Sequence, residues 1–195
     1  MISGKLNLNQ YEVSTNESRW KCFLENHGLY TLVSSLDNIL FVDNSLVIEE
    51  ELDSYTAAIL SDFLRYELLK TSKTFSFETV FSHPSKLSFM KEANQQGYKC
   101  YLYFMGVSSP QICVDRVLQR TLEGGHGVPE EKIRKRYDLA LNNLFEAIYL
   151  SHRSYVFDNS LKDMNLVAEV NPQQKLTLVR EHIPVWFKES ILDKL

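Results

Sequence analysis

The residues best suited to chemistry surround a glycine-rich, basic stretch in the second half of the chain. Residues 121–137 read TLEGGHGVPEEKIRKRY, and Arg116 and Arg120 stand four residues apart just before it. Arginines that close over a ligand from both sides of a flexible loop stabilise the charge on a transferring phosphoryl group. The alternative is an ordinary connection between two helices with solvated charges. Because Arg120 and Arg136 lie on opposite sides of the loop, we favour the phosphate-binding interpretation.

A second polar cluster follows a predicted strand in the sequence FSFETVFSHPSK. Glu78, Thr79, Ser82 and His83 crowd the turn before the next helix. Such groups suit recognition of a hydroxyl or another polar group of a small-molecule substrate. The alternative is helix capping by Ser82 or His83, with Glu78 in a structural ion pair. The residue types alone favour this alternative.

A third cluster, Asp158-Asn159-Ser160, follows another predicted strand. It suits contact with a nucleotide base or an Asx turn, and the sequence leaves both open. His126 has no acidic or cysteine partner at metal-ligand spacing, so we predict no metal ligands.

Alternating strands and helices must position these clusters. Hydrophobic periodicity, proline and glycine predict helices over residues 53–71, 84–96, 110–122, 129–152 and 184–195. Strands are expected over 74–79, 99–107 and 154–158, with edge strands over 166–169 and 176–179. This order predicts an α/β domain with a doubly wound, mostly parallel sheet. In such sheets ligands bind beyond the carboxyl ends of the strands, so the residues just after each predicted strand matter most. These are residues 78–83, Ser108-Ser109 and residues 158–160.

The first 52 residues have a different pattern. Residues 1–14 are loop-like, 15–26 are helical, and 38–49 suggest a hairpin around Asp43-Asn44-Ser45. We therefore divide the chain into a small inserted helical and hairpin segment, 1–52, and a core, 53–195.

The composition is that of a protein with a hydrophobic core. The 195 residues are 44% hydrophobic, and their net charge of -4 offers no general attraction to nucleic acid or an anionic membrane. No apolar run approaches the roughly 18 residues of a membrane span, and the N-terminus has no signal-peptide core. Cys22, Cys100 and Cys113 are expected to be reduced and buried. We predict a cytoplasmic protein.

Four segments, in this order, resemble the zeta toxin family of P-loop kinases and most closely its bacterial ATPase-like branch. They read FSFETVFSHPSK, GYKCYLYFMGVSSP, DRVLQRTLEGGHGVPEEKIRKRYDLALNNLFEAI and YVFDNS. The resemblance covers roughly residues 53–160. It implies a P-loop kinase fold, ATP and Mg²⁺, and phosphoryl transfer to a hydroxyl of a small substrate, such as a UDP-linked amino sugar. It also implies a toxin–antitoxin context with an antitoxin-like partner.

The resemblance also implies roles for individual residues. Glu78 and Thr79 look like the substrate-side pair of the family, and Arg120 and Arg136 look like its phosphate-contacting lid arginines. Arg116 is similar to the arginine that packs near the base in related small kinases.

Two parts of the family pattern do not occur in this sequence. A P-loop needs G-x-x-x-x-G-K-[ST], whereas Ser3-Gly4-Lys5 is followed by Leu6. A match for the family's catalytic Asp segment is likewise missing. The prediction is thus a kinase core truncated at its N-terminus, with weak or no activity and a sheet edge open to a second copy or a partner. The alternative is a non-catalytic binding, regulatory or assembly module of the same fold.

Overall fold

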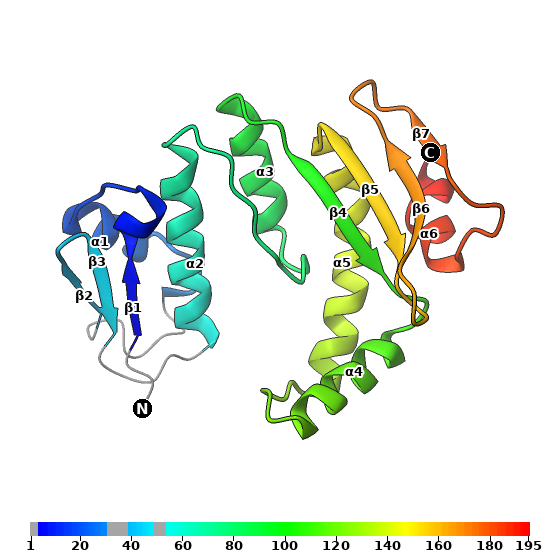
Figure 1. Ribbon diagram of the computed structural model, residues 1–195, viewed down its shortest axis with the longest axis horizontal. Helices are drawn as coiled ribbons and strands as arrows, with labels where there is room; N and C mark the ends of the chain where they lie inside the picture. Colours follow the sequence, from blue (N-terminus) through cyan, green and yellow to red (C-terminus); the bar gives the residue numbers. More distant parts are fainter. Residues whose placement is uncertain (1–3, 31–38, 49–53) are drawn as a thin grey trace. The chain divides into compact units, whose positions relative to one another are not determined.

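The computed structural model describes residues 4–30, 39–48 and 54–195, in two compact units (Figure 1). The first unit is Met1–Ser76 and the second is Phe77–Leu195. This boundary differs from the predicted division after residue 52. Among the described residues, no helix has both the length and the apolar character needed to cross a membrane.

The first unit is built on a small antiparallel sheet in the order β1-β3-β2. Its elements are β1 (Gly4–Asn7), η1 (Leu8–Tyr11), α1 (Glu17–Glu25), β2 (Ile39–Val42), β3 (Ser45–Ile48) and α2 (Ser54–Leu69). The predicted hairpin is confirmed: Asp43 and Asn44, both at positive φ, form the two-residue turn between β2 and β3. The predicted loop over residues 1–14 is wrong where β1 pairs with β3.

Helix α2 belongs to this first unit because of its apolar stripe. Ile59 and Phe63 are fully buried and pack in one cluster with Trp20 of α1 and Leu46 of β3. The Trp20 and Phe63 rings meet edge to face with their centroids 5.0 Å apart. The chain therefore passes from one core to the next after α2, which explains the position of the observed boundary.

The second unit contains a four-stranded sheet in the order β4-β5-β6-β7. Its elements are α3 (Ser85–Gln95), β4 (Tyr101–Gly106), α4 (Pro110–Leu122), α5 (Glu130–Leu150), β5 (Arg153–Asp158), β6 (Asn165–Val170), β7 (Leu176–Leu178), α6 (Val185–Ser190) and η4 (Leu192–Lys194). The predicted helices before residue 184 are confirmed to within two residues at their ends, whereas the helix predicted over 184–195 ends at Ser190 and is followed by the 3₁₀ turn η4.

The sheet is mixed rather than mostly parallel. Only β4 and β5 are parallel; β6 and β7 are antiparallel to their neighbours. β6 and β7 run antiparallel to the strand before them because the segments after β5 and β6 are too short for the crossover connection that a parallel neighbour needs. The strand predicted over residues 74–79 does not form, since no described strand pairs with it.

The core of the second unit lies on one face of this sheet. Leu144 of α5 and Phe187 of α6 pack with Val156 of β5. On β4, Tyr101 and the alternate residues Tyr103 and Met105 are about half exposed. The predicted strand over 99–107 is confirmed, but one of its faces is exposed, although its nearly continuous apolar sequence is typical of a strand buried on both faces.

Candidate functional site

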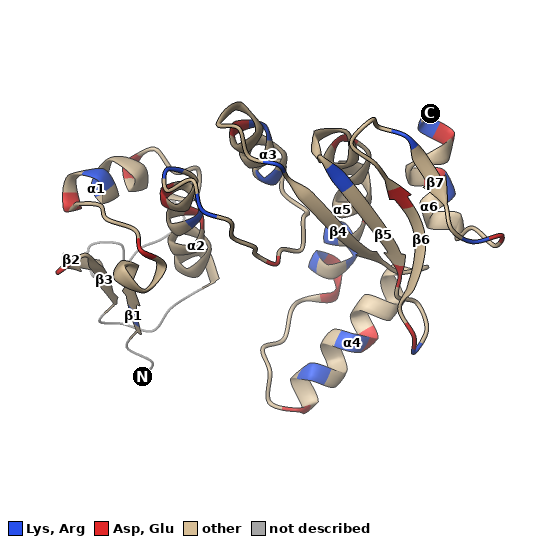
Figure 2. Ribbon diagram, turned by 45° about the horizontal axis from the view of Figure 1, so that its top comes forward, with Lys and Arg blue, Asp and Glu red and all other residues tan. Residues whose placement is uncertain are grey.

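The candidate site lies where α4 and α5 form a helical hairpin beyond the carboxyl end of β4. Basic residues recur along α4 and at the start of α5 (Figure 2). The hairpin is attached to the sheet through Tyr137, whose hydroxyl donates to the Val107 carbonyl at 3.0 Å. Burial raises the pKa of Tyr137, and nearby negative charge, first that of Cys113, adds to the shift. Tyr137 therefore remains a neutral hydrogen-bond donor.

The two glycines of the GGH stretch end α4. Gly124 has a φ of 91°, and its N–H donates to the Thr121 carbonyl at 3.1 Å. The N–H of Gly125 donates to the Arg120 carbonyl at 2.9 Å. This pair of bonds is a Schellman motif, in which a glycine takes the left-handed position just past the helix. The glycine loop is thus fastened by backbone bonds to the last turn of α4.

Arg116 and Arg120 are engaged by backbone carbonyls. Arg116 donates to the carbonyl of Asn159 at 2.6 Å, which links α4 to the segment after β5. Arg120 donates to the carbonyl of His126 at 2.9 Å, in the glycine loop that follows α4. Both side chains are exposed, and each one connects α4 to another segment of the chain through a hydrogen bond to a backbone carbonyl.

The arginines of α5 differ from each other. Arg134 pairs with Glu130 at 2.7 Å and donates to Gln111 of α4. Arg136 is partly buried, yet it makes no hydrogen bond or ion pair with any of the described residues. The guanidinium of Arg136 therefore has its donors available to a ligand.

The segment after β5 is closed by its own hydrogen bonds. Asp158 Oδ1 accepts from the Ser160 N–H at 3.3 Å and from the Ser160 hydroxyl at 2.5 Å. The indole N–H of Trp186 lies 3.4 Å from the same oxygen. Ser160 Oγ in turn accepts from the Ser108 N–H at 2.8 Å. These bonds form the Asx turn that the sequence left open, while contact of Asp158 and Asn159 with a base stays a prediction.

The predicted substrate turn is braced around one residue. Phe81 is buried and has a φ of 61°, a left-handed conformation that costs energy for any residue but glycine. The Thr79 hydroxyl oxygen accepts from the Phe81 N–H at 3.2 Å, and Asn143 Nδ2 donates to the Phe81 carbonyl at 2.9 Å. Neither Tyr137 nor Asn143 was expected from the sequence. Asn143 could have been singled out in the sequence as a polar residue next to the apolar stripe of the helix that became α5.

The other members of this turn are near the surface. Glu78 and His83 are exposed and Ser82 is half-buried. His83 Nδ1 accepts from the Ser85 N–H at 3.2 Å, at the first residue of α3, but the N-cap residue of this helix is Pro84 rather than the predicted Ser82 or His83. The turn thus keeps the exposed Glu78 carboxylate beside a fixed backbone.

Helix α5 connects the turn to the arginine site. Asn143 comes seven residues after Arg136. Seven residues are almost two helical turns, so the two side chains leave nearly the same side of α5, about 10 Å apart along its axis. Because Asn143 contacts the Phe81 carbonyl, this side of α5 faces the turn. The geometry brings Arg136 and the 79–83 segment to one side of the second unit.

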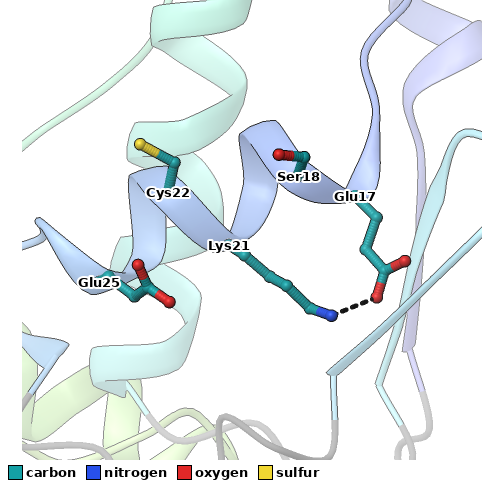
Figure 3. A pocket seen from close by; sticks show the side chains of 5 residues that line it. All are labelled: Glu17, Ser18, Lys21, Cys22 and Glu25. Carbon is teal, nitrogen blue, oxygen red and sulfur yellow. Dashed lines mark ion pairs between the residues drawn. The ribbon is translucent and has the colours of Figure 1, made fainter.

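A pocket elsewhere, on α1 of the first unit, contains none of these residues (Figure 3). Its lining comes from one helix: Glu17, Ser18, Lys21, Cys22 and Glu25. Lys21 pairs with Glu17 at 2.7 Å, and this bond raises the lysine pKa. Cys22 is exposed here, so the prediction of a buried thiol is wrong for this residue. The described residues bring together no group of three or more potential metal-binding side chains.

Comparison with known proteins assigns no activity. No protein-family model matches the chain, and no solved structure matches it. An uncharacterised protein of Haemophilus influenzae is 30% identical over 63 residues, which are 32% of this chain and 45% of that protein. The chain thus spans less than half the length of this relative, and the resemblance to zeta-toxin-type kinases stays a hypothesis.

Proposed function

We propose that the second unit binds the phosphate groups of a nucleotide beside Arg136, as the lid side of a phosphoryl-transfer protein of the zeta-toxin type. The observation that carries this proposal is the contrast among the hairpin arginines. Arg116, Arg120 and Arg134 all have protein acceptors, whereas Arg136 has none among the described residues.

Arg136 is partly buried as a whole residue, and a charged group that gives up water gains stability from a replacement hydrogen bond. A phosphate group would supply that bond with matched charge and a two-pronged geometry. The exposed Glu78 and Thr79, on the side of the unit reached by the same helix, suit the hydroxyl acceptor of a phosphoryl group.

The described residues contain no group of three or more potential metal-binding side chains, so Mg²⁺ bound here would depend on the nucleotide phosphates for most of its ligands. The chain's own contribution is to bind and orient. Arg136 would bind the anion, and the hydrogen-bonded Phe81 turn would keep the groups that bind the hydroxyl acceptor at a fixed place.

Calorimetry on the intact chain tests the proposal. Titrations with ATP, with and without Mg²⁺, are compared with adenosine, which lacks the phosphates. The Arg136→Gln variant removes the charge, and Lys135→Gln is the matched control, because Lys135 is the exposed neighbour on the same helix. A charge-assisted hydrogen bond contributes about 1.5–3 kcal/mol, which corresponds to about 10- to 150-fold in affinity.

The expected result is ATP binding that weakens at least tenfold in Arg136→Gln and less than twofold in Lys135→Gln. Adenosine should bind much more weakly than ATP. Equal binding by wild type and Arg136→Gln, equal binding of adenosine and ATP, or no binding of ATP at all would each contradict the proposal. ATP turnover, measured in the same samples, separates a kinase from the non-catalytic binding module.

A further inference from the structure

The side chain and the backbone of Arg120 both hold the glycine loop. Its carbonyl accepts the Gly125 N–H at 2.9 Å, and its guanidinium donates to the His126 carbonyl at 2.9 Å. One residue thus fastens two consecutive loop residues to the end of α4.

Gly125 is fitted to this arrangement. A Cβ atom at this position would lie 2.8 Å from Arg120 Cγ and 2.9 Å from the Arg120 carbonyl oxygen. Carbon atoms in good contact are about 3.5–4.0 Å apart, so a methyl group would push the arginine and the loop away from each other. The glycine allows the close approach that the two bonds require.

The geometry points to Arg120 as a positioning residue, which acts on a bound anion through the shape of the 124–127 loop and does not touch the anion. This inference rests on the proposed phosphate site at Arg136. It assigns Arg120 a role different from the phosphate contact that the family resemblance implies. In this arrangement the loop after α4 is set in place before a ligand arrives, so α5 begins at a defined point and presents Arg136.

Two variants that act in chemically different ways distinguish a positioning role of Arg120 from direct contact between Arg120 and the anion. Arg120→Gln removes the charge and the bond to His126. Gly125→Ala keeps the charge but forces the loop off Arg120. If Arg120 positions the loop, the two variants behave alike. Leu118→Ala, at an exposed position on the same helix, is the control.

The first readout is amide hydrogen exchange at Gly124 and Gly125 without ligand. Both test variants should speed exchange, by about two- to fivefold for the loss of one exposed hydrogen bond, and the control should not. The second readout is ATP affinity at several salt concentrations. Loss of a direct ionic contact flattens the salt dependence, whereas a displaced loop weakens binding without changing its slope.

We expect Arg120→Gln and Gly125→Ala to weaken ATP binding to a similar extent, with the wild-type salt dependence and unchanged melting temperature. A flatter salt dependence in Arg120→Gln alone, with wild-type exchange, would assign Arg120 to direct contact and overturn the inference. Unchanged exchange in both variants would also overturn it. If wild type binds no ATP, the proposed function fails, whereas the exchange comparison still decides whether Arg120 fastens the loop.

Discussion

The end of β4 packs so closely on α6 that a single methyl group at Gly106 should destabilise the second unit. A Cβ atom there would lie 2.3 Å from Trp186 Cη2 and 2.5 and 2.7 Å from two further carbons of the ring. Since carbon atoms pack at about 3.5–4.0 Å, the Gly106→Ala substitution requires the ring or the strand to retreat by about 1 Å.

The stability lost in Gly106→Ala depends on how firmly the Trp186 ring is held. Trp186 is 4% exposed, and its centroid lies 6.1 Å from that of Phe104 and 5.9 Å from that of Phe187. Overpacking a core costs about 1–3 kcal/mol, and losing a buried tryptophan about 3–5 kcal/mol. We expect Gly106→Ala to fall between these limits, at about 2–4 kcal/mol. The melting temperature should fall by about 5–15 °C for a chain of this size.

Urea denaturation followed by circular dichroism, together with thermal melting, measures this cost. Gly28→Ala is the control, because a Cβ there meets no atom of the described residues within 4 Å and should change the free energy of unfolding by less than about 0.5 kcal/mol. Trp186→Leu removes the ring, and Gly106→Ala should add little in that background.

Two outcomes would refute this reasoning. One is a Gly106→Ala variant whose stability is close to that of wild type, within about 1 kcal/mol. The other is an equal cost of Gly106→Ala with and without Trp186, which would show that the ring is not the obstacle. If the cost is confirmed, ATP binding by the variant also shows whether the Trp186 contact with Asp158 matters at the site.

Buried groups supply the remaining predictions. Ser154 is fully buried and its hydroxyl has no hydrogen-bond partner among the described residues, so Ser154→Ala should raise the free energy of unfolding by about 1 kcal/mol. Ser151→Ala should lower it in the same denaturation assay, because the Ser151 hydroxyl is hydrogen-bonded. Burial raises the thiol pKa of Cys100 and Cys113, which leaves less thiolate at about pH 8. Ellman's reagent should therefore modify exposed Cys22 first, and the other two should accelerate as the pH rises above about 9; three equal rates would contradict this.

The local elements of this protein could be predicted from its sequence. Pro110 begins α4, and Gly124 ends it at positive φ. The Asp43-Asn44 pair marks the hairpin turn. Each of these signals acts through bonds between residues a few positions apart, and such bonds depend little on the rest of the chain.

The sheet was harder to predict because strand pairing is not local. The apolar sequence of β4 is typical of a strand buried on both faces, yet Tyr103 is more than half exposed in the described structure. Similarly, Phe75 and Phe77 alternate with polar residues as in a strand, but a strand forms only where a neighbour accepts its backbone bonds.

Local sequence signals predict where the arginines and the glycine loop lie along the chain, and on which helices. The contacts of each arginine depend instead on tertiary packing. Arg116 meets a carbonyl 43 residues away, and Asn143 meets the Phe81 carbonyl 62 residues away. Arg136, on nearly the same side of α5 as Asn143, meets no acceptor among the described residues. The reason is that local periodicity sets the face on which a side chain lies, whereas the packing of distant segments sets which polar atoms reach it.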